Sequence, residues 1–405
     1  MAIEGRIFIK DQAMALSAPV TDTIEASGFP LCFKVLQGEA RPEVLGLADS
    51  HDRFTVQARA MGGHQKEAVV TEGAGGSAWR MVSDEGAGLK GTDLAPFPLG
   101  FMAAGLQADL LSRLSQLATA EHIRLEHLQS DLTNHYAFEG SFFKGTGRGH
   151  AHPPRIVIRA TTDTSAERVR ALVARAVAAS PILAAWQAPL VNTFALYANG
   201  HRRGLPHLAT SPAPDAIDPL KAWRDVPRPL DAAPPVHPLI ERLGPAELPA
   251  GITPPSWQSG RVEIPIHGSC ALEGESARST AWANLPGGSR FALQSAASRS
   301  NDHAPSGLAY AFAGVAFCLM TQLLRYVEHH HMKIRALRIV QHADCEVTRG
   351  IARAHALDTH IFVHGEESEA VMERLVQMAA DTCYLHAAFH SALESVVEVE
   401  VKARA

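Results

Sequence analysis

The sequence contains one long internal repeat, and no other feature restricts the possible folds as strongly. The segment Ala95-Pro96-Phe97-Pro98-Leu99 returns in the second half of the chain as Ala304-Pro305-Ser306-Gly307-Leu308. Such a repeat has to be identified before individual helices and strands, because it decides the architecture. With the same offset and no gap, the alignment pairs Gly105 with Gly314, Leu114 with Leu323, His122 with His331, Leu125 with Ile334 and Leu128 with Leu337.

The similarity continues on both sides of this segment. Upstream, Gly75-Gly76-Ser77-Ala78-Trp79 matches Gly287-Gly288-Ser289-Arg290-Phe291. Downstream, the stretch from Ser165 to Leu190 matches the stretch from Ser368 to Leu393. Both copies therefore run in the same order, and the chain is a tandem duplication of one domain.

The length of 405 residues suffices for two hydrophobic cores of ordinary size. We predict one domain over residues 1–200 and a second over residues 256–405. Between them, residues 201–255 are dense in proline, which is unfavourable inside a helix or strand. This stretch is therefore expected to be an extended linker or wrap.

Each copy predicts strands, a long helix, further strands, a shorter helix and a last strand. In the second copy, Pro305 opens the segment Ala309–Met320, which is apolar on every side and is typical of a helix buried all round. Ser368 can cap the shorter helix, which is expected to run from Glu369 to about Leu393. Alternating polarity indicates strands at residues 336–347, 359–364 and 396–401, and the first copy is expected to have strands at 155–161 and 192–198 around a helix at 165–187.

Charge and hydropathy exclude several classes of partner. The formal net charge is -5, with 37 basic and 42 acidic residues, so no strong positive field is available for nucleic acid or an anionic membrane. Met1–Met14 is charged and has no apolar run of signal-peptide length, and no later stretch is expected to span a bilayer. We expect a cytoplasmic protein that binds neither nucleic acid nor a membrane.

The cysteines form neither a disulfide framework nor a zinc ribbon, because their number is odd and no CxxC motif is present. Cys318 falls in the predicted buried helix and Cys383 in the later, shorter helix. The first copy has Asp109 and Ser180 at these two positions, so it has lost the pair. The remaining cysteines are expected to be structural: Cys32, Cys270 and Cys345.

A buried helix with Gly314-x-x-x-Cys318, followed by a later helix with Cys383, resembles the OsmC/Ohr family, the osmotically inducible protein C and organic hydroperoxide resistance proteins. The resemblance covers both copies. In that family two subunits intertwine into a dimer, with the active sites at their interface. The resemblance therefore implies an α+β fold in which two tandem OsmC-like domains form a pseudo-dimer within one chain, each a curved, mainly antiparallel sheet with a buried central helix. Association of two such chains into a homodimer stays open.

The resemblance also implies a thiol site. Cys318 matches the peroxide-attacking cysteine of the family and Cys383 its resolving cysteine, whereas Asp109 and Ser180 cannot perform thiol chemistry. The implied activity is reduction of an organic hydroperoxide at one site, which the first copy helps to enclose. An external dithiol or lipoyl-type reductant is implied, and no cofactor.

Two features of the family are harder to place in this chain. Its Pro-Glu pair before the central helix corresponds to Pro305-Ser306 in the second copy and to Pro96-Phe97 in the first. Its partner arginine has two candidates, Arg290 and Arg80, which lie beside the repeated Gly-Gly-Ser segments. Because the glutamate is missing, two other functions stay open. One is a cysteine hydrolase that acts on an electrophilic carbonyl compound with histidine as base, and the other is a non-catalytic small-molecule binding protein.

Polar residues near the repeat supply further candidates. Asp109 lies on the predicted buried helix of the first copy, so it must be paired, protonated or exposed to a cavity. The structural interpretation is pairing with Arg113, and the functional one is substrate binding or acid–base chemistry. His303 precedes Pro305 and can either replace the missing glutamate or serve as a turn residue.

A metal site is the rival interpretation of the second cysteine. Cys383, His386 and His390 lie at positions i, i+3 and i+7, which share one face of a continuous helix. Thiolate and imidazole are good ligands of zinc or iron. The simpler interpretation is that the histidines line a wet cavity or hydrogen-bond to neighbours, and we expect no metal.

Overall fold

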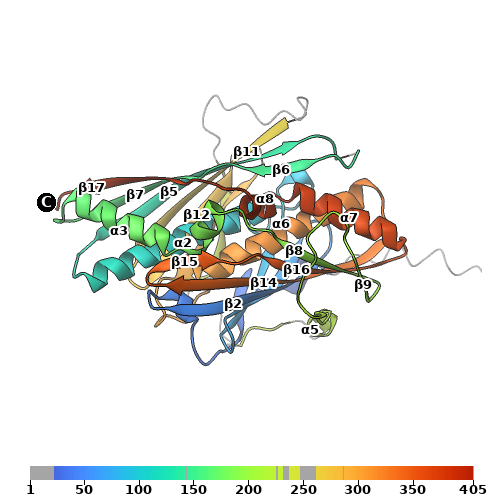
Figure 1. Ribbon diagram of the computed structural model, residues 1–405, viewed down its shortest axis with the longest axis horizontal. Coiled ribbons are helices and arrows are strands. Elements are labelled where there is room, and N and C mark those ends of the chain that lie inside the picture. The colour runs from blue at the N-terminus through green and yellow to red at the C-terminus, as the bar shows by residue number, and fades with distance from the viewer. Residues whose placement is uncertain are drawn as a thin grey trace, which may run out of the picture.

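The computed structural model describes residues 22–142, 144–224, 227–230, 237–246, 261–285 and 287–404 (Figure 1). In the first half the main elements are α1 (Ile24–Ser27), β1 (Cys32–Leu36), η1 (Glu43–Leu45), β2 (Ser50–Ala60), β3 (Lys66–Glu72), β4 (Ala78–Ser83), η2 (Ala87–Leu89), α2 (Pro98–Ala120), β5 (Glu126–Glu139), β6 (Arg148–Ala151), β7 (Arg155–Thr161), α3 (Ala166–Ala178), α4 (Pro181–Gln187) and β8 (Thr193–Ala198). After β9 (His201–Arg203) and α5 (Leu220–Arg224), the second half contains β10 (Ile240–Pro245), β11 (Arg261–Glu273), β12 (Ser276–Ala283), β13 (Ser289–Ala296), α6 (Gly307–His329), β14 (Ile334–Thr348), β15 (Ile351–Ala354), β16 (Asp358–Gly365), α7 (Glu369–Thr382), α8 (Tyr384–His390) and β17 (Val396–Lys402).

Each of the two sheets combines strands from both halves. One sheet has the order β1-β4-β3-β2-β14-β16-β8-β9, with β15 paired to β14, and the other has the order β10-β13-β12-β11-β5-β7-β17, with β6 paired to β5. Strands that are equivalent in the repeat occupy equivalent places in the two sheets. Most pairs are antiparallel, whereas β16 with β8 and β17 with β7 are parallel. The predicted α+β pseudo-dimer is confirmed, and its two halves are interleaved.

Long antiparallel strand pairs join the halves in the middle of each sheet. In one sheet β14 pairs with β2 from Arg338 opposite Arg59 to Val347 opposite Ser50. In the other, β11 pairs with β5 along a similar length. A sheet of this kind satisfies its backbone hydrogen-bonding groups only when both halves are present. The halves therefore depend on each other for their secondary structure.

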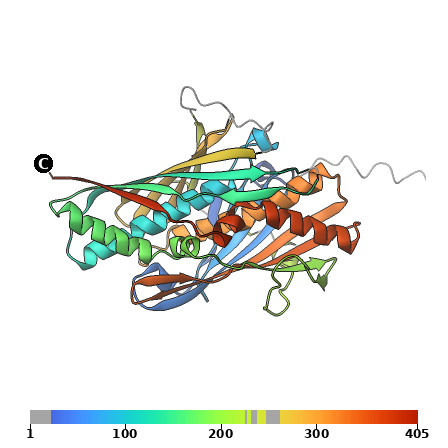
Figure 2. The same cartoon turned by 45° about the horizontal axis from the view of Figure 1, so that its top comes forward.

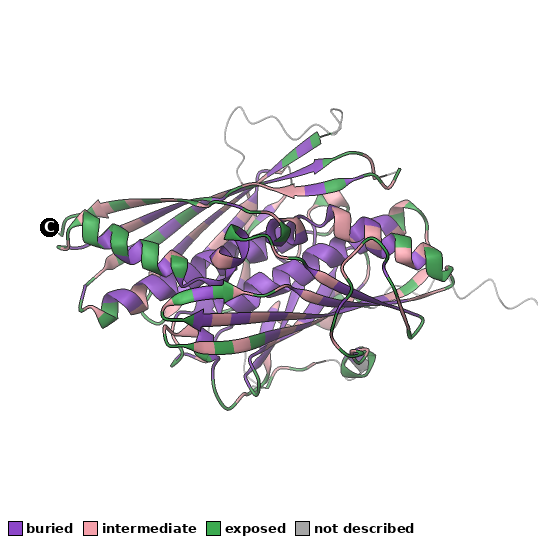
Figure 3. Ribbon diagram, in the orientation of Figure 1, coloured by how far each residue is buried: buried purple, intermediate pink, exposed green. Residues whose placement is uncertain are grey.

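The two long helices, α2 and α6, lie between the sheets (Figures 1 and 2). Both are buried along most of their length (Figure 3), which matches the prediction of helices apolar on every side. They approach each other closely at glycines: a Cβ atom on Gly105 would lie 2.4 Å from the carbonyl oxygen of Gly307, and one on Gly314 would lie 2.8 Å from that of Pro98. The repeated glycine is therefore required by the contact between the helices.

Equivalent side chains also exchange contacts across the pseudo-twofold axis. Asp93, in the loop before α2, accepts a hydrogen bond of 3.1 Å from the backbone N–H of Ser289 in the second half. Asp302, in the loop before α6, accepts a hydrogen bond of 3.0 Å from the hydroxyl of Ser77 in the first half. In each direction the aspartate of one half contacts the serine of the other, which is the reciprocal pattern of an isologous dimer interface.

The shorter helix of each copy differs from its prediction, because it is broken. In the second half α7 ends at Thr382 and α8 begins at Tyr384, with Cys383 between them. In the first half α3 and α4 are bent by 78°, and Pro181 opens α4. Helical periodicity in the sequence continues across Cys383, and neither proline nor glycine marks the break there, so a single helix was predicted.

By length and composition, the helix Gly307–His329 could cross a membrane, contrary to the prediction. However, 94% of its most apolar window is buried inside the protein.

The segment 201–255 contains β9, α5 and β10 in its described part, and β10 pairs with β13. It is therefore more ordered than a plain linker, while the domain boundaries stay a prediction.

Candidate active site

A cavity of about 290 Å³ lies between the two halves, beside the middle of α6. Its wall is mostly apolar. The first half contributes the end of η2 and the start of α2, with Leu89, Phe97 and Leu99, and the second half contributes β11, with Val262, Ile264 and Ile266. Apolar walls with a few polar groups are typical of small-molecule sites.

The polar side of the cavity is one face of α6. Cys318, Thr321, Gln322 and Arg325 all line it. These residues are spaced by three, four and seven positions, so they follow one another on the same face of the helix. Of the site residues predicted from the sequence, Cys318 is the one that lines the cavity, and its side chain is only 2% exposed. The other three were missed, although their spacing from Cys318 is a usable signal.

The structure brings Cys318 and Cys383 together. Both are free thiols, and Cys318 is a hydrogen-bond partner of Cys383. Burial, followed by the contact with Cys318, raises the pKa of the Cys383 thiol well above its ordinary value, while the backbone N–H groups of His386 and Leu385 oppose this shift. Cys383 is therefore a protonated thiol at neutral pH, next to a cysteine that faces the cavity.

The first half supplies a tyrosine beside the two thiols. Burial raises the pKa of Tyr136 on β5 well above its ordinary value, and Cys318 and Cys383 raise it further. Its hydroxyl accepts a hydrogen bond of 2.8 Å from the Asn134 amide. The thiol pair is thus enclosed by residues of both halves, as the resemblance implied.

His386 contacts the second cysteine and not the first. Its Nδ1 atom lies 3.1 Å from the sulfur of Cys383. Burial lowers the pKa of His386 to about 4, so the ring is neutral at neutral pH. Its ring also packs against Phe194, with the centroids 5.3 Å apart.

Arg325 is the cation at the other end of the polar face. Its guanidinium lies 4.0 Å from the centre of the Phe142 ring and donates a hydrogen bond of 3.2 Å to Gln322. It also lies near Tyr384, because it lowers the pKa of that phenol against the larger raising effect of burial. None of the ion pairs found among the described residues involves Arg325. This charge is therefore available to an anion in the cavity.

The two carboxylates that line the cavity, in contrast, already have cationic partners. Glu85 accepts hydrogen bonds from Lys66 at 2.9 Å and from Thr321 at 2.5 Å. Asp93 forms an ion pair of 2.6 Å with Arg242. Their charges are offset, so Arg325 leaves the cavity with a positive balance.

The two arginines predicted from the sequence are not among the residues that line the cavity. Arg290 lies over the ring of Trp282, 5.5 Å from its centre. Arg80 is fully buried and donates a hydrogen bond of 2.7 Å to Glu67. Both were selected for their closeness in sequence to the Gly-Gly-Ser segments. Closeness along a strand does not reveal which face of the sheet carries a side chain, since successive residues alternate between the faces.

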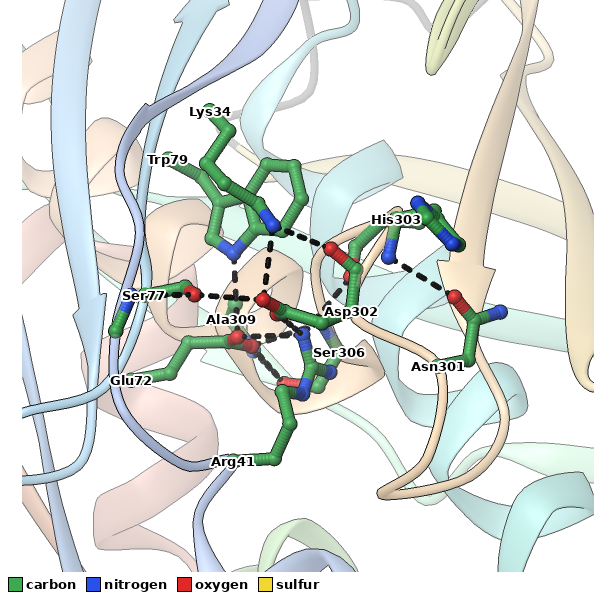
Figure 4. Close-up of polar contacts among 12 residues, drawn as sticks. Lys34, Arg41, Glu72, Ser77, Trp79, Asn301, Asp302, His303, Ser306 and Ala309 are labelled. Atoms are coloured by element: carbon green, nitrogen blue, oxygen red, sulfur yellow. Dashed lines mark hydrogen bonds and ion pairs between the residues drawn. The ribbon is translucent and has the colours of Figure 1, made fainter. Parts of the chain in front are cut away.

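A carboxylate does reach the start of α6, but it comes from the other half (Figure 4). Glu72 on β3 accepts a hydrogen bond of 2.8 Å from the backbone N–H of Ser306 and forms an ion pair of 2.9 Å with Arg41. His303 is exposed beside this cluster, and its backbone N–H donates to Asn301. The glutamate that is missing at Ser306 is thus replaced in space by Glu72, and His303 does not take its place.

The three residues considered as alternative metal ligands do not all converge, although His386 contacts Cys383. His390 is exposed, and its Nδ1 atom lies 3.1 Å from the carbonyl oxygen of Leu190. The break at Cys383 removes the continuous helix face on which the set depended. Within the described part of the chain, no group of three or more His, Cys, Asp or Glu residues is arranged to hold a metal ion.

In the first half, the positions equivalent to the thiols form a salt-bridged cluster. Asp109 pairs with Arg113 at 2.9 Å and accepts a hydrogen bond of 2.7 Å from Ser180. Arg113 also donates to the carbonyl oxygen of Val44, and Gln116 donates to that of Leu45. Arg113 and Gln116 are the counterparts of Gln322 and Arg325, so here these side chains hold the η1 turn in place of a ligand.

Part of the second half is similar to a known protein family. Residues 300–398 match the family model for OsmC-like protein. A solved structure, that of an OsmC-like hydroperoxide resistance protein from Jannaschia sp. CCS1, is 18% identical; the match covers 30% of this chain and 82% of that chain, with a TM-score of 0.19. No curated protein matches the chain.

Proposed function

Residues 300–398 are an OsmC-like domain, and from this premise we propose that the protein is a thiol-dependent peroxidase that reduces an organic hydroperoxide. The observation that carries the proposal is the contact between Cys318, which lines an apolar cavity, and the buried Cys383. Two adjacent free thiols, one of which faces a cavity, are what a peroxidase with a resolving cysteine requires.

The proposed chemistry has three steps. The Cys318 thiolate attacks the terminal oxygen of the hydroperoxide, the O–O bond breaks, and the alkoxide takes a proton to leave as an alcohol. The resulting sulfenic acid condenses with Cys383 to a disulfide and water. An external dithiol, such as a dihydrolipoyl group, then reduces the disulfide by thiol–disulfide exchange.

Arg325 supports the first step in this proposal. A thiolate is the reactive form of cysteine, and a nearby cation favours it. Arg325 lines the same cavity and is not neutralised by a carboxylate ion pair within the described residues. Its charge is also suitable to stabilise the negative charge that develops on the leaving oxygen.

The decisive experiment follows the consumption of cumene hydroperoxide with dihydrolipoamide as reductant. The wild type is expected to turn over, Cys318→Ser to be inactive, and Cys383→Ser to stop after about one equivalent, because its sulfenic acid has no resolving partner. Cys270→Ser is the matched control, since Cys270 is a buried cysteine that is not among the residues lining the cavity. Consumption by Cys318→Ser at the wild-type rate contradicts the proposal.

A cysteine hydrolase is less well supported by the geometry. Such an enzyme needs a base beside the nucleophile. The imidazole that contacts the thiol pair, His386, lies against Cys383, which is not among the residues that line the cavity. We further propose a cytoplasmic location, in keeping with five free cysteines, because reducing compartments maintain thiols.

A further inference from the structure

His386 is a polar group at the thiol pair to which the peroxidase chemistry above assigns no task. Its Nδ1 atom lies 3.1 Å from the sulfur of Cys383 at the buried junction of α7 and α8. We infer that His386 is a further catalytic residue, which accepts the thiol proton of Cys383 as this sulfur attacks the oxidised Cys318. The inference rests on the proposed function, because it concerns the step that forms the disulfide.

In this step the sulfur of Cys383 bonds to the sulfenic sulfur of Cys318, and the S–O bond of the sulfenic acid breaks. The thiol proton moves to Nδ1 of His386, and the departing hydroxide takes it up to become water. The hydroperoxide has already oxidised Cys318, so no further oxidant is needed. The imidazole returns to its neutral form when the water has left.

The surroundings keep the acceptor neutral and the donor protonated. Burial lowers the pKa of His386 to about 4, and no charged neighbour contributes to this shift. Burial and the contact with Cys318 raise the pKa of Cys383, so its thiol retains the proton until it reacts. Two phenols also lie near the thiols, Tyr136 and Tyr384, and burial raises the pKa of both, so they remain protonated. The neighbours on β8 and before it, Phe194 and Asn192, carry no charge.

The first half provides an internal comparison. There Ser180 takes the place of Cys383, and Leu183 takes the place of His386. Ser180 donates its hydrogen to Asp109 in a fixed hydrogen bond, and no disulfide can form. The imidazole is thus present in the half that retains the thiols and absent from its equivalent position in the half that has lost them.

The histidine also carries a structural cost that leucine would avoid. Its Nε2 atom is buried and has no hydrogen-bond partner among the described residues. A buried polar atom without a partner destabilises the folded state. A residue that only fills space at this junction needs no imidazole, whereas a proton acceptor at Nδ1 brings the second ring nitrogen, Nε2, with it.

The test separates oxidation of Cys318 from formation of the disulfide. The reduced full-length protein is mixed with one equivalent of cumene hydroperoxide, and samples are quenched over time for mass spectrometry of sulfenic acid and disulfide. The variants are His386→Leu, which copies the first half, and His386→Gln, which retains a polar side chain. His390→Gln is the control, because His390 lies on the same helix but is exposed.

Both His386 variants are expected to oxidise Cys318 at the wild-type rate but to form the disulfide about a hundredfold more slowly, as is typical for loss of a general base. Their rate of disulfide formation should rise about tenfold per pH unit, because it then depends on the thiolate fraction of Cys383. The wild-type rate should stay nearly flat over the same range. Wild-type rates and a flat profile in folded His386→Gln overturn the inference.

A second probe distinguishes failure of this inference from failure of the proposed function. An aromatic disulfide such as Ellman's reagent forms a mixed disulfide with Cys318, and attack by Cys383 then releases a second aromatic thiolate. This attack needs the same proton transfer but no hydroperoxide. If the wild type consumes no hydroperoxide but the His386 variants still delay the second release, the proposed function fails and the base assignment stands. If hydroperoxide is consumed and the second release is unaffected in the variants, the base assignment fails alone.

Discussion

The hydroxyl of Ser180 donates a hydrogen bond of 2.7 Å to the carboxylate of Asp109, at the two positions that Cys383 and Cys318 occupy in the second half. The repeat therefore retains the contact between its two helices while it changes the chemistry of that contact. In one half the pair consists of two free thiols, and in the other it is a polar cluster with an ion pair to Arg113. Four predictions test this division and the fold that supports it.

Arg325→Gln should lower kcat/KM for an organic hydroperoxide by about tenfold to a thousandfold, which is the range seen when an electrostatic stabiliser is removed from an active site. Glutamine retains hydrogen-bonding capacity but removes the positive charge that lines the same cavity as Cys318. Arg290→Gln is the control, since Arg290 lies over Trp282 and is not among the lining residues. Steady-state kinetics measure kcat/KM, and melting temperatures show whether each variant is folded. An equal loss of kcat/KM in both variants contradicts the role assigned to Arg325.

Asp109→Ala should destabilise the protein by about 3–5 kcal/mol, because removal of one partner leaves a buried charge uncompensated. The charge in question is that of Arg113, which is 1% exposed. Asp163→Ala removes an exposed ion pair with Arg404 and should cost less than about 1 kcal/mol. Urea unfolding measures both, and similar values for the two variants would argue against a structural role for the Asp109 cluster.

Gly314→Ala should destabilise the packing of α2 against α6 by about 1–3 kcal/mol, as overpacking does. The new Cβ atom would lie 2.8 Å from the carbonyl oxygen of Pro98 and 3.1 Å from the backbone nitrogen of Met102. Alanine is favoured over glycine in a helix by about 1 kcal/mol, so a net loss shows that the clash prevails. Gly204→Ala, where nothing lies within 4 Å, serves as control in the same thermal unfolding series.

Asp358→Asn should cost stability at pH 5 and much less at pH 2. Burial on its own raises the pKa of Asp358, but hydrogen bonds from His360, Thr193 and Ser211 prevail and lower it to about 2. A carboxyl group with a lowered pKa stabilises the folded state above its unfolded pKa, and this contribution is lost as the pH falls through the folded value. Denaturant titrations of wild type and variant at both pH values give the difference; an equal cost at both removes the basis for this prediction.

The repeat alone was enough to predict the duplicated architecture and the buried central helices. The shared offset of Gly105 and Gly314 reflects a real steric requirement, because both glycines permit close contact between helices. The pairing of Cys318 with Cys383 followed from the family resemblance, and the two side chains are in contact. The interleaving of strands was implied by the dimers of that family, and no local pattern in this chain could have revealed it.

Other parts of the site depend on contacts that a single sequence does not encode locally. Glu72 reaches Ser306 from the opposite half, so no motif around Ser306 predicts this contact. Arg290 and Arg80 are not among the residues that line the cavity, because strand alternation and other partners place their side chains elsewhere. Arg325 could be predicted from the sequence, because it lies seven residues after Cys318 and thus on the same face of α6.

The interleaved sheets have a consequence for how such a protein can evolve. When two separate, identical subunits form a dimer, every substitution appears twice, so both sites change together. Joining the subunits in one chain makes their association independent of concentration and ties each half to one specific mate. One half can then carry an ion pair where the other carries two thiols, and the molecule is asymmetric in chemistry although its fold is nearly symmetric.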